Sequence, residues 1–173
     1  MQERHKNRKL YFHELAQTSQ KFFIPYIKQF KRLEQDCRIL EIGCGDGGNL
    51  LPFAQMGCYT LGVDISEGRI ADARKFFMDC KAKGDFLASD IFLLEELYGT
   101  FDVIICHDVI EHIGEKSVFF RYCHSSSQRM ALFSCRFLLG RCLSVDISRY
   151  VEVKSSVIYR LSISFQKHSS VCF

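Results

Sequence analysis

Four glycines within six residues are the first sign of chemistry in this chain. Gly43, Gly45, Gly47 and Gly48 follow the short apolar run 39–42 and precede a segment with apolar residues at helical spacing. Glycine allows positive φ angles and lets the backbone approach a ligand without a Cβ clash. A strand, a glycine turn and a helix in this order are typical of nucleotide sites in α/β sheets. The stretch therefore predicts a nucleotide-binding turn.

An acidic residue ends the next apolar run, which covers residues 59–63. Asp64 lies 21 positions after Gly43, close to the spacing of about 20 at which an acidic residue reaches the ribose of a bound nucleotide. A carboxylate suits this role because it accepts two hydrogen bonds from a vicinal diol. The alternative role, capping the following helix, fits Ser66 better. We therefore expect Asp64 to bind a ribose.

A third apolar run, residues 86–91, is expected to form a strand with Asp90 near its end. The Asp90 carboxylate could accept a hydrogen bond from the exocyclic amine of a base, with Ile91 against the ring. A surface aspartate that follows a strand without any ligand role is an equally good explanation.

His107, Asp108 and His112 follow the most strand-like segment, Phe101–Cys106. That segment is nearly all apolar, which predicts a central strand buried on both faces. Polar groups at the carboxyl end of such a strand lie where open α/β sheets bind ligands. The two histidines are five positions apart, a poor fit to one helix face, so we expect no metal site.

The elements that must position these residues alternate between strand and helix patterns up to about residue 120. This alternation predicts an α/β fold with a doubly wound, mostly parallel sheet, helices on both faces and right-handed crossovers. Before the sheet, residues 10–33 carry apolar side chains at helical spacing. Pro25 is expected to divide them into two helices, because proline disfavours helical backbone at Ile24.

The composition is typical of one globular domain. The chain has 173 residues, 47% of them hydrophobic and 25% charged, and a net charge of +3. This charge is too small to indicate a nucleic-acid partner. No apolar run approaches a membrane span and the first residues are polar and charged, so we expect neither membrane insertion nor a secretory segment. The nine cysteines contain no Cys-x-x-Cys pair, which favours reduced thiols in a cytoplasmic protein.

Four segments together resemble the class I S-adenosylmethionine-dependent methyltransferases, especially the branch that acts on small molecules. They are Leu-Glu-Ile-Gly-Cys-Gly-Asp-Gly (40–47), Gly-Val-Asp-Ile-Ser (62–66), Ser-Asp-Ile (89–91) and Phe-Asp-Val-Ile-Ile-Cys-His-Asp-Val-Ile-Glu-His-Ile (101–113). The resemblance covers roughly residues 38–113. It implies a Rossmann-like fold and S-adenosylmethionine as the cofactor.

The resemblance also implies a role for each matching position. Glu41 and the glycine turn would hold the methionine part of the cofactor, Asp64 the ribose, and Asp90 with Ile91 the adenine. The residues implied for cofactor binding are, in chain order, Glu41, Gly43, Cys44, Gly45, Gly47, Asp64, Ile65, Asp90, Ile91 and His107.

The glycine run alone also fits a nicotinamide cofactor, because Gly43–Gly48 satisfies the pattern G-x-G-x-x-G. A pyrophosphate favours bare amides at a helix N-terminus. Here Glu41 and Asp46 bracket the turn, and their carboxylates would repel a pyrophosphate but attract the ammonium and sulfonium groups of S-adenosylmethionine. An NAD-dependent oxidoreductase is therefore the less favoured alternative.

Methyl transfer depends mainly on alignment and on exclusion of water. A hydroxyl acceptor of high pKa also needs a general base. His107, Asp108 and His112 are the candidates, and His107 is favoured because Glu111-His112 more often shapes the loop in the family. The expected acceptor is a small metabolite, a lipid or a quinone-like ring. The Asn/Asp-Pro-Pro-aromatic motif of amino-group methyltransferases is absent after residue 106.

The composition changes near residue 120. Residues 121–173 contain 12 serines, against 4 in the first 120 residues. We expect N-terminal helices over 1–36, the cofactor domain over 37–135, with a fifth strand at 130–134, and an atypical tail over 136–173. A frameshifted ending, which would leave a truncated or inactive chain, and a divergent substrate-binding tail are both compatible with this change. Sequencing of the locus distinguishes the two, because an intact reading frame with a normal stop excludes a frameshift.

Overall fold

The computed structural model describes residues 7–97, 99–136 and 142–143. Its six strands form one sheet in the order β3-β2-β1-β4-β5-β6, in which the first five are parallel and β6 is antiparallel to β5. The strands are β1 Arg38–Ile42, β2 Tyr59–Asp64, β3 Asp85–Ala88, β4 Phe101–His107, β5 Ser127–Arg136 and β6 Cys142–Leu143. The order runs outward from β1 in both directions, which confirms the doubly wound, mostly parallel sheet.

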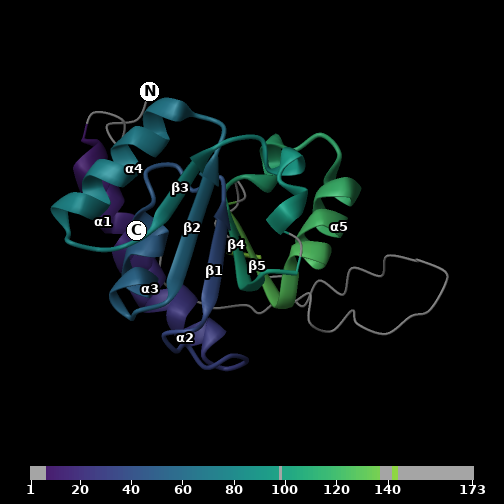
Figure 1. The fold of residues 1–173 in the computed structure, drawn as a ribbon, viewed down its shortest axis with the longest axis horizontal. Helices are drawn as coiled ribbons and strands as arrows, with labels where there is room; N and C mark the ends of the chain where they lie inside the picture. The colour runs from purple at the N-terminus through teal and green to yellow at the C-terminus, as the bar shows by residue number, and fades with distance from the viewer. Residues whose placement is uncertain (1–6, 98, 137–141, 144–173) are drawn as a thin grey trace.

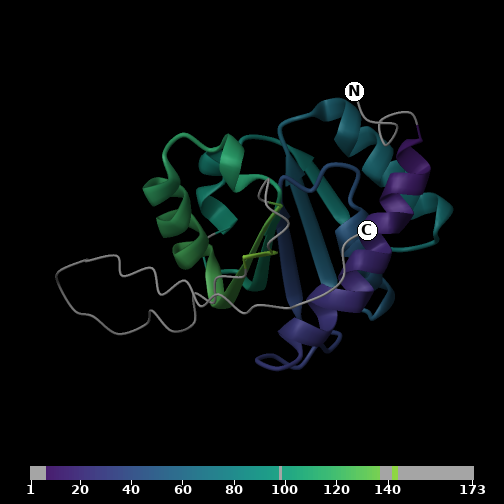
Figure 2. The same ribbon diagram turned by 180° about the vertical axis from the view of Figure 1, so that it is seen from behind.

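Helices cover both faces of this sheet (Figure 1 and Figure 2). α1, α3 and α4 lie against one face, and α5 lies against the other. The α-helices are α1 Arg8–Thr18, α2 Ile24–Ile27, α3 Leu51–Gln55, α4 Glu67–Asp79 and α5 Lys116–Ser126. Short 3-10 helices occupy Gly48–Leu50 (η3), Ile91–Leu93 (η4), Glu95–Leu97 (η5) and Ile110–His112 (η6).

Each face of the sheet buries its own apolar cluster. In β1, Ile39 belongs to the cluster under α1 and α4, and Leu40 belongs to the cluster under α5. In β4, Val103 and Ile104 alternate in the same way. Successive side chains of a strand point to opposite faces. This explains why the central strands have continuous apolar sequences rather than alternating ones.

The N-terminal helical segment differs from the expectation of two separate helices. The chain stays helical from Arg8 to Ile27, with a π-helical turn at Ser19–Phe23 (η2) between α1 and α2. Ile24 has helical angles, φ −59° and ψ −51°. Pro25 lies in the first turn of α2, where a missing N–H costs little. The wider π turn therefore accommodates the proline, and the prediction of a break at Ile24 was wrong.

The third strand is shorter than expected. β3 ends at Ala88, so Asp90 and Ile91 lie beyond it. The Asp90 side chain accepts a hydrogen bond of 3.0 Å from the Phe92 amide and caps η4. This local cap ends the strand because aspartate side chains bond nearby backbone amides readily.

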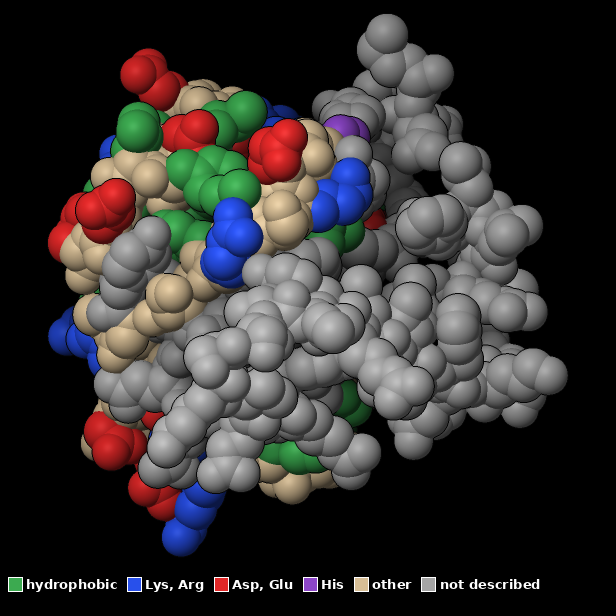
Figure 3. Space-filling model, turned by 90° about the vertical axis from the view of Figure 1, so that its right-hand side faces the viewer, with side chains coloured by type: hydrophobic (Ala, Val, Ile, Leu, Met, Phe, Trp, Pro, Cys, Tyr) green, Lys and Arg blue, Asp and Glu red, His purple; other side chains and the backbone are tan. Residues whose placement is uncertain are grey.

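The expected fifth strand, residues 130–134, lies within β5, next to β4. The rest of the expected atypical tail, residues 137–141 and 144–173, lies outside the described residues. Within the described segments, no helix is long and apolar enough to cross a membrane. Acidic, basic and hydrophobic side chains are mixed on the face shown in Figure 3, with no large area of one charge among the described residues there.

Candidate cofactor and active site

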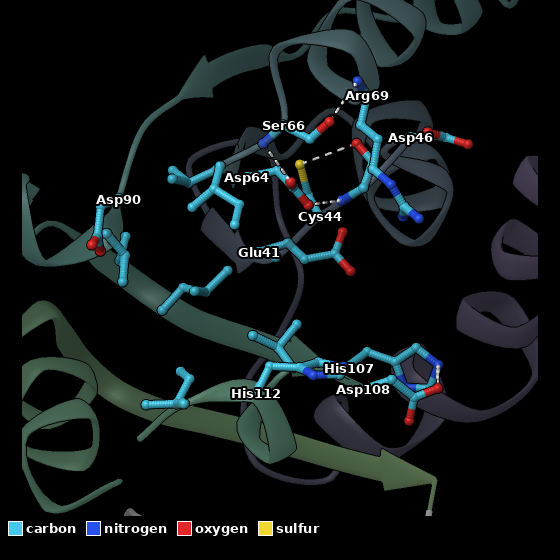
Figure 4. A pocket seen from close by; sticks show the side chains of 18 of the residues that line it. Glu41, Cys44, Asp46, Asp64, Ser66, Arg69, Asp90, His107, Asp108 and His112 are labelled. Atoms are coloured by element: carbon cyan, nitrogen blue, oxygen red, sulfur yellow. Dashed lines mark hydrogen bonds and ion pairs between the residues drawn. The ribbon is translucent and has the colours of Figure 1, made fainter. Parts of the chain in front are cut away.

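A cavity of about 1180 Å³ opens at the carboxyl ends of the central strands (Figure 4). Its wall combines the glycine turn after β1, the ends of β2 and β4, the loop after β3, and α1. The wall contains the polar side chains that we expected from the sequence to contact a nucleotide cofactor or to act as a base. They are Glu41, Asp64, Asp90, His107, Asp108 and His112. The cavity therefore sits where open α/β sheets bind ligands.

The glycine turn has the backbone conformation that only glycine adopts easily. Gly43 and Gly45 have φ angles of +69° and +54°. A Cβ at Gly43 would lie 2.1 Å from a side-chain carbon of Val109. Cys44 between them is buried, which raises the pKa of its thiol and makes it a small packing residue rather than a nucleophile.

Asp64 lies at the end of β2, beside the turn. Its Oδ2 accepts a hydrogen bond of 2.9 Å from the Gly45 amide, and its Oδ1 accepts one of 2.9 Å from the Ser66 amide. Ser66 is the N-cap of α4, as the sequence indicated. Asp64 thus has an anchoring role that the sequence did not show, while its carboxylate still faces the cavity.

Glu41 and Asn49 form a buried polar pair in the cavity wall. The Asn49 amide donates a hydrogen bond of 2.7 Å to Glu41 Oε1. Glu41 Oε2 and Asn49 Oδ1 are buried and accept no hydrogen bond from the part of the chain that the structure describes. Burial raises the pKa of Glu41 to about 8. Glu41 therefore carries a proton at neutral pH in the ligand-free chain, and a bound ammonium group would bring several donors to these two oxygens and displace that proton.

Asn49 was missed by the sequence reasoning. It is an amide side chain, 2% exposed, directly before the apolar residues Leu50 and Leu51. The sequence indicated it only as a polar residue at the start of an apolar helical segment. This observation is a weak indication of a ligand site, since asparagine is also common near helix starts, where it caps the helix.

Asp46 does not provide the free negative charge that the sequence suggested for attracting a cationic cofactor. Its carboxylate is paired with the guanidinium of Arg8, whose Nε donates at 3.2 Å to Asp46 Oδ2. Another nitrogen of Arg8 pairs with Asp72 of α4. The charge of Asp46 is therefore compensated, so the preference of the turn for a cation depends on Asp64, and on Glu41 once a bound cation displaces its proton.

The cavity wall also offers an apolar surface and the Asp90 carboxylate. Ile65 lines it with 80% of its surface exposed, whereas Ile91 is only 6% exposed. An isoleucine so exposed inside a cavity offers apolar surface that a flat ring would cover. Asp90 lines the same cavity, although its Oδ1 already caps η4.

His107 is the last residue of β4, and Asp108 follows it directly. The His107 ring packs against Phe23 with 5.5 Å between centroids, and its Nε2 lies 3.6 Å from Asp108 Oδ2. Asp108 has a φ of +53°, a strained value for a residue with a Cβ. His112 lies on the same wall and is exposed. The described residues contain no group of three or more His, Cys, Asp or Glu side chains that could hold a metal ion.

Comparison with known proteins places this site in context. A family model described as a methyltransferase domain matches residues 39–128. An uncharacterized protein of Rickettsia prowazekii is 41% identical over 85 residues, which make up 47% of this chain and 34% of that protein. A ubiquinone biosynthesis O-methyltransferase of Sinorhizobium medicae is 36% identical over 86 residues, 50% of this chain and 35% of that enzyme. The chain thus spans about a third of the length of these relatives.

A solved structure agrees with the sequence matches. The magnesium protoporphyrin IX methyltransferase of Synechocystis, with S-adenosylhomocysteine (SAH) bound, superposes with a TM-score of 0.59 at 26% identity. The superposition covers 69% of this chain and 54% of that enzyme.

Proposed function

Because this chain belongs to the methyltransferase domain family, whose model covers just over half of it, we propose that it transfers a methyl group from S-adenosylmethionine to a small molecule. One observation carries the proposal. Glu41 Oε2 and Asn49 Oδ1 are buried oxygens of residues in the cavity wall, without a hydrogen-bond partner among the described residues. The ammonium group of S-adenosylmethionine supplies donors to these oxygens and favours the ionised form of Glu41, whereas the pyrophosphate of a nicotinamide cofactor brings only acceptors and negative charge.

The remaining cavity residues fit the other parts of the same cofactor. Asp64, beside the glycine turn, accepts hydrogen bonds from the ribose hydroxyls. Ile65 covers one side of the adenine, and Asp90 accepts from its amine. These roles use side chains that line a single cavity, and the solved relative with SAH bound supports the choice of ligand.

When bound, S-adenosylmethionine supplies an electrophilic methyl group on a sulfonium. The chain contributes alignment, a water-poor wall and a place for the proton of the acceptor. His107, with 12% of its side chain exposed, takes that proton, and the nearby Asp108 carboxylate stabilises the imidazolium. His112, exposed on the same wall, is the second candidate base.

The acceptor belongs to the small-molecule class, with an oxygen nucleophile. The ubiquinone biosynthesis O-methyltransferase among the relatives supports this choice. So does the presence of a histidine at the end of β4, where an Asn/Asp-Pro-Pro motif would follow the strand in amino-group methyltransferases. A quinol or phenol hydroxyl fits a site that offers a base next to apolar walls.

Calorimetry with the full chain tests the cofactor. We expect SAH to bind at micromolar concentration and NAD not to bind. Glu41→Gln should weaken SAH binding, whereas Glu34→Gln, which changes an exposed carboxylate before β1, should not. Binding of NAD without SAH would overturn the proposal, and so would the absence of heat with either ligand.

A transfer assay with S-adenosylmethionine labelled in the methyl group tests the acceptor class. We expect label in phenolic or quinol compounds and none in peptides or nucleic acid. Label in protein or nucleic acid alone would contradict the small-molecule assignment. In the same assay, His107→Gln should reduce turnover more than His112→Gln, and the reverse order would exchange the roles of the two histidines.

A further inference from the structure

The N-terminal helix forms part of the cavity wall and lies directly on the chain that follows the glycine turn. Tyr11 and Leu15 of α1 line the cavity. A Cβ at Gly48 would lie 2.4 Å from the Phe12 carbonyl oxygen, so the two backbones nearly touch. The Ser19 hydroxyl, at the end of α1, donates a hydrogen bond of 2.8 Å to the Asn49 carbonyl. The position of α1 therefore affects the shape of the ligand site.

The middle and the two ends of α1 are held in different ways. Phe12, in the middle, is fully buried against Phe76 and Phe77 of α4. The C-terminal end has the Ser19 hydrogen bond. At the N-terminal end the contact is ionic, because Arg8 is the first residue of α1. Hydrophobic packing of Phe12 thus fixes the middle of the helix, and the ion pairs of Arg8 fix its first turn.

Arg8 joins three elements through one guanidinium. Its Nε and one terminal nitrogen pair with both oxygens of Asp46 in the glycine turn, and its other terminal nitrogen pairs with Asp72 of α4. The Asp46 side chain is 5% exposed, so its charge needs a partner. A guanidinium suits this place because its planar fork binds a carboxylate with two parallel hydrogen bonds.

We infer that Arg8 is a positioning residue for cofactor retention: it holds the first turn of α1 against the glycine turn and so limits the rate at which the ligand leaves. This inference rests on the proposed function. Loss of Arg8 frees the first turn of α1 and leaves Asp46 to turn towards water. The core under Phe12 stays packed, so the effect falls on the rate of ligand dissociation more than on the fold.

Lys9 provides a matched control in the same helical turn. It has the same charge as Arg8 and pairs with Asp79 of α4 at 3.7 Å, but its side chain is 63% exposed and it does not line the cavity. Lys9→Met therefore removes one positive charge and one ion pair from α1 without changing the wall.

The test measures SAH dissociation by stopped flow for the full chain, Arg8→Met and Lys9→Met. We expect the dissociation rate of Arg8→Met to rise about tenfold and that of Lys9→Met to change less than twofold. Hydrogen exchange supplies a second readout, in which amides of α1 should exchange faster in Arg8→Met while those of β1 stay protected. Arg8→Lys, which keeps the charge but loses the fork, should restore the rate only in part.

Equal dissociation rates for the unchanged chain and Arg8→Met, with equal exchange in α1, would overturn the inference. The same increase in both methionine variants would also overturn it, because the effect would then come from charge alone. Where Arg8→Met does not fold, Asp72→Asn removes one arm of the bridge from outside the cavity and should raise the rate in the same direction. Failure of the unchanged chain to bind SAH contradicts the proposed function instead, so the two failures are distinguishable.

Discussion

The Gly45 amide donates a hydrogen bond of 2.9 Å to Asp64 Oδ2, so the carboxylate that faces the cavity also holds the glycine turn. The other oxygen of Asp64 accepts from the Ser66 amide and fixes the start of α4. The ends of β1 and β2 are thus connected through one side chain. A change at Asp64 alters the shape of the turn as well as the direct contact with a ligand.

Asp64→Ala is expected to weaken SAH binding by roughly 1–3 kcal/mol, the scale for leaving buried polar partners unpaired. It should also lower the thermal midpoint, because two backbone amides lose their acceptor. Calorimetry and thermal unfolding measure the two effects. Asp85→Ala removes an exposed carboxylate from the start of β3 and should leave the affinity unchanged. Unchanged affinity in Asp64→Ala would falsify its assignment to the ligand.

Glu41 should make the stability of the ligand-free chain depend on pH. Burial raises its pKa from the ordinary 4.5 to about 8, with a smaller opposing effect from the Asn49 hydrogen bond. Between these values the folded chain keeps a proton that the unfolded chain releases. The free energy of unfolding therefore falls as the pH rises from about 4.5 to 8, by up to about 1.4 kcal/mol per pH unit.

Urea unfolding at several pH values between 5 and 8 measures this dependence. Glu41→Gln has no titrating group at this position, so its stability should change less over the same range. Parallel pH profiles for the two proteins would show that Glu41 does not keep its proton in the folded state.

Much of the fold follows from local sequence. The apolar runs at β1, β2 and β4 are long enough, and β-branched enough, to predict buried strands with bounds within one residue of those observed. β3 was harder to predict, because the last three residues of the expected run, 89–91, lie beyond it, where the Asp90 side chain caps η4. A hydrogen bond between a side chain and a nearby amide outweighs a weak strand preference there.

The site was predictable in its position but not in its internal contacts. Glycine, acid and histidine positions at strand ends indicate a cavity, since the ends of parallel strands meet at one edge. The pairing of Arg8 with Asp46 joins residues 38 positions apart and depends on how α1 packs. The partner of Glu41, Asn49, depends on the direction of the first helical turn after the glycines. The hydrophobic periodicity of the sequence predicts helices and strands, but it does not predict either of these two side-chain contacts.

Gly43→Ala is expected to destabilise the fold and abolish SAH binding. Its φ of +69° costs an alanine about 1–2 kcal/mol, and the added Cβ would lie 2.1 Å from Val109. Gly68→Ala is the matched control, because Gly68 lies in α4 with no atom within 4 Å of an added Cβ. That change should stabilise the chain by up to about 1 kcal/mol. Thermal unfolding compares the two variants, and a stable Gly43→Ala that still binds SAH would contradict the close approach of Val109.

Asp108 and Lys81 share a φ of +53°, but only Asp108 lines the cavity. Glycine at either position relieves left-handed strain, a gain reduced by the greater freedom of glycine in the unfolded chain. We expect Lys81→Gly to raise stability by roughly 0.5–1 kcal/mol without changing turnover.

Asp108→Gly relieves the same strain but removes the carboxylate beside His107, so turnover should fall about tenfold or more while SAH affinity changes little. Thermal unfolding, calorimetry and the labelled-methyl assay separate these effects. Full turnover in Asp108→Gly would mean that the left-handed backbone at Asp108 shapes the loop after β4 and that the Asp108 carboxylate does not assist His107.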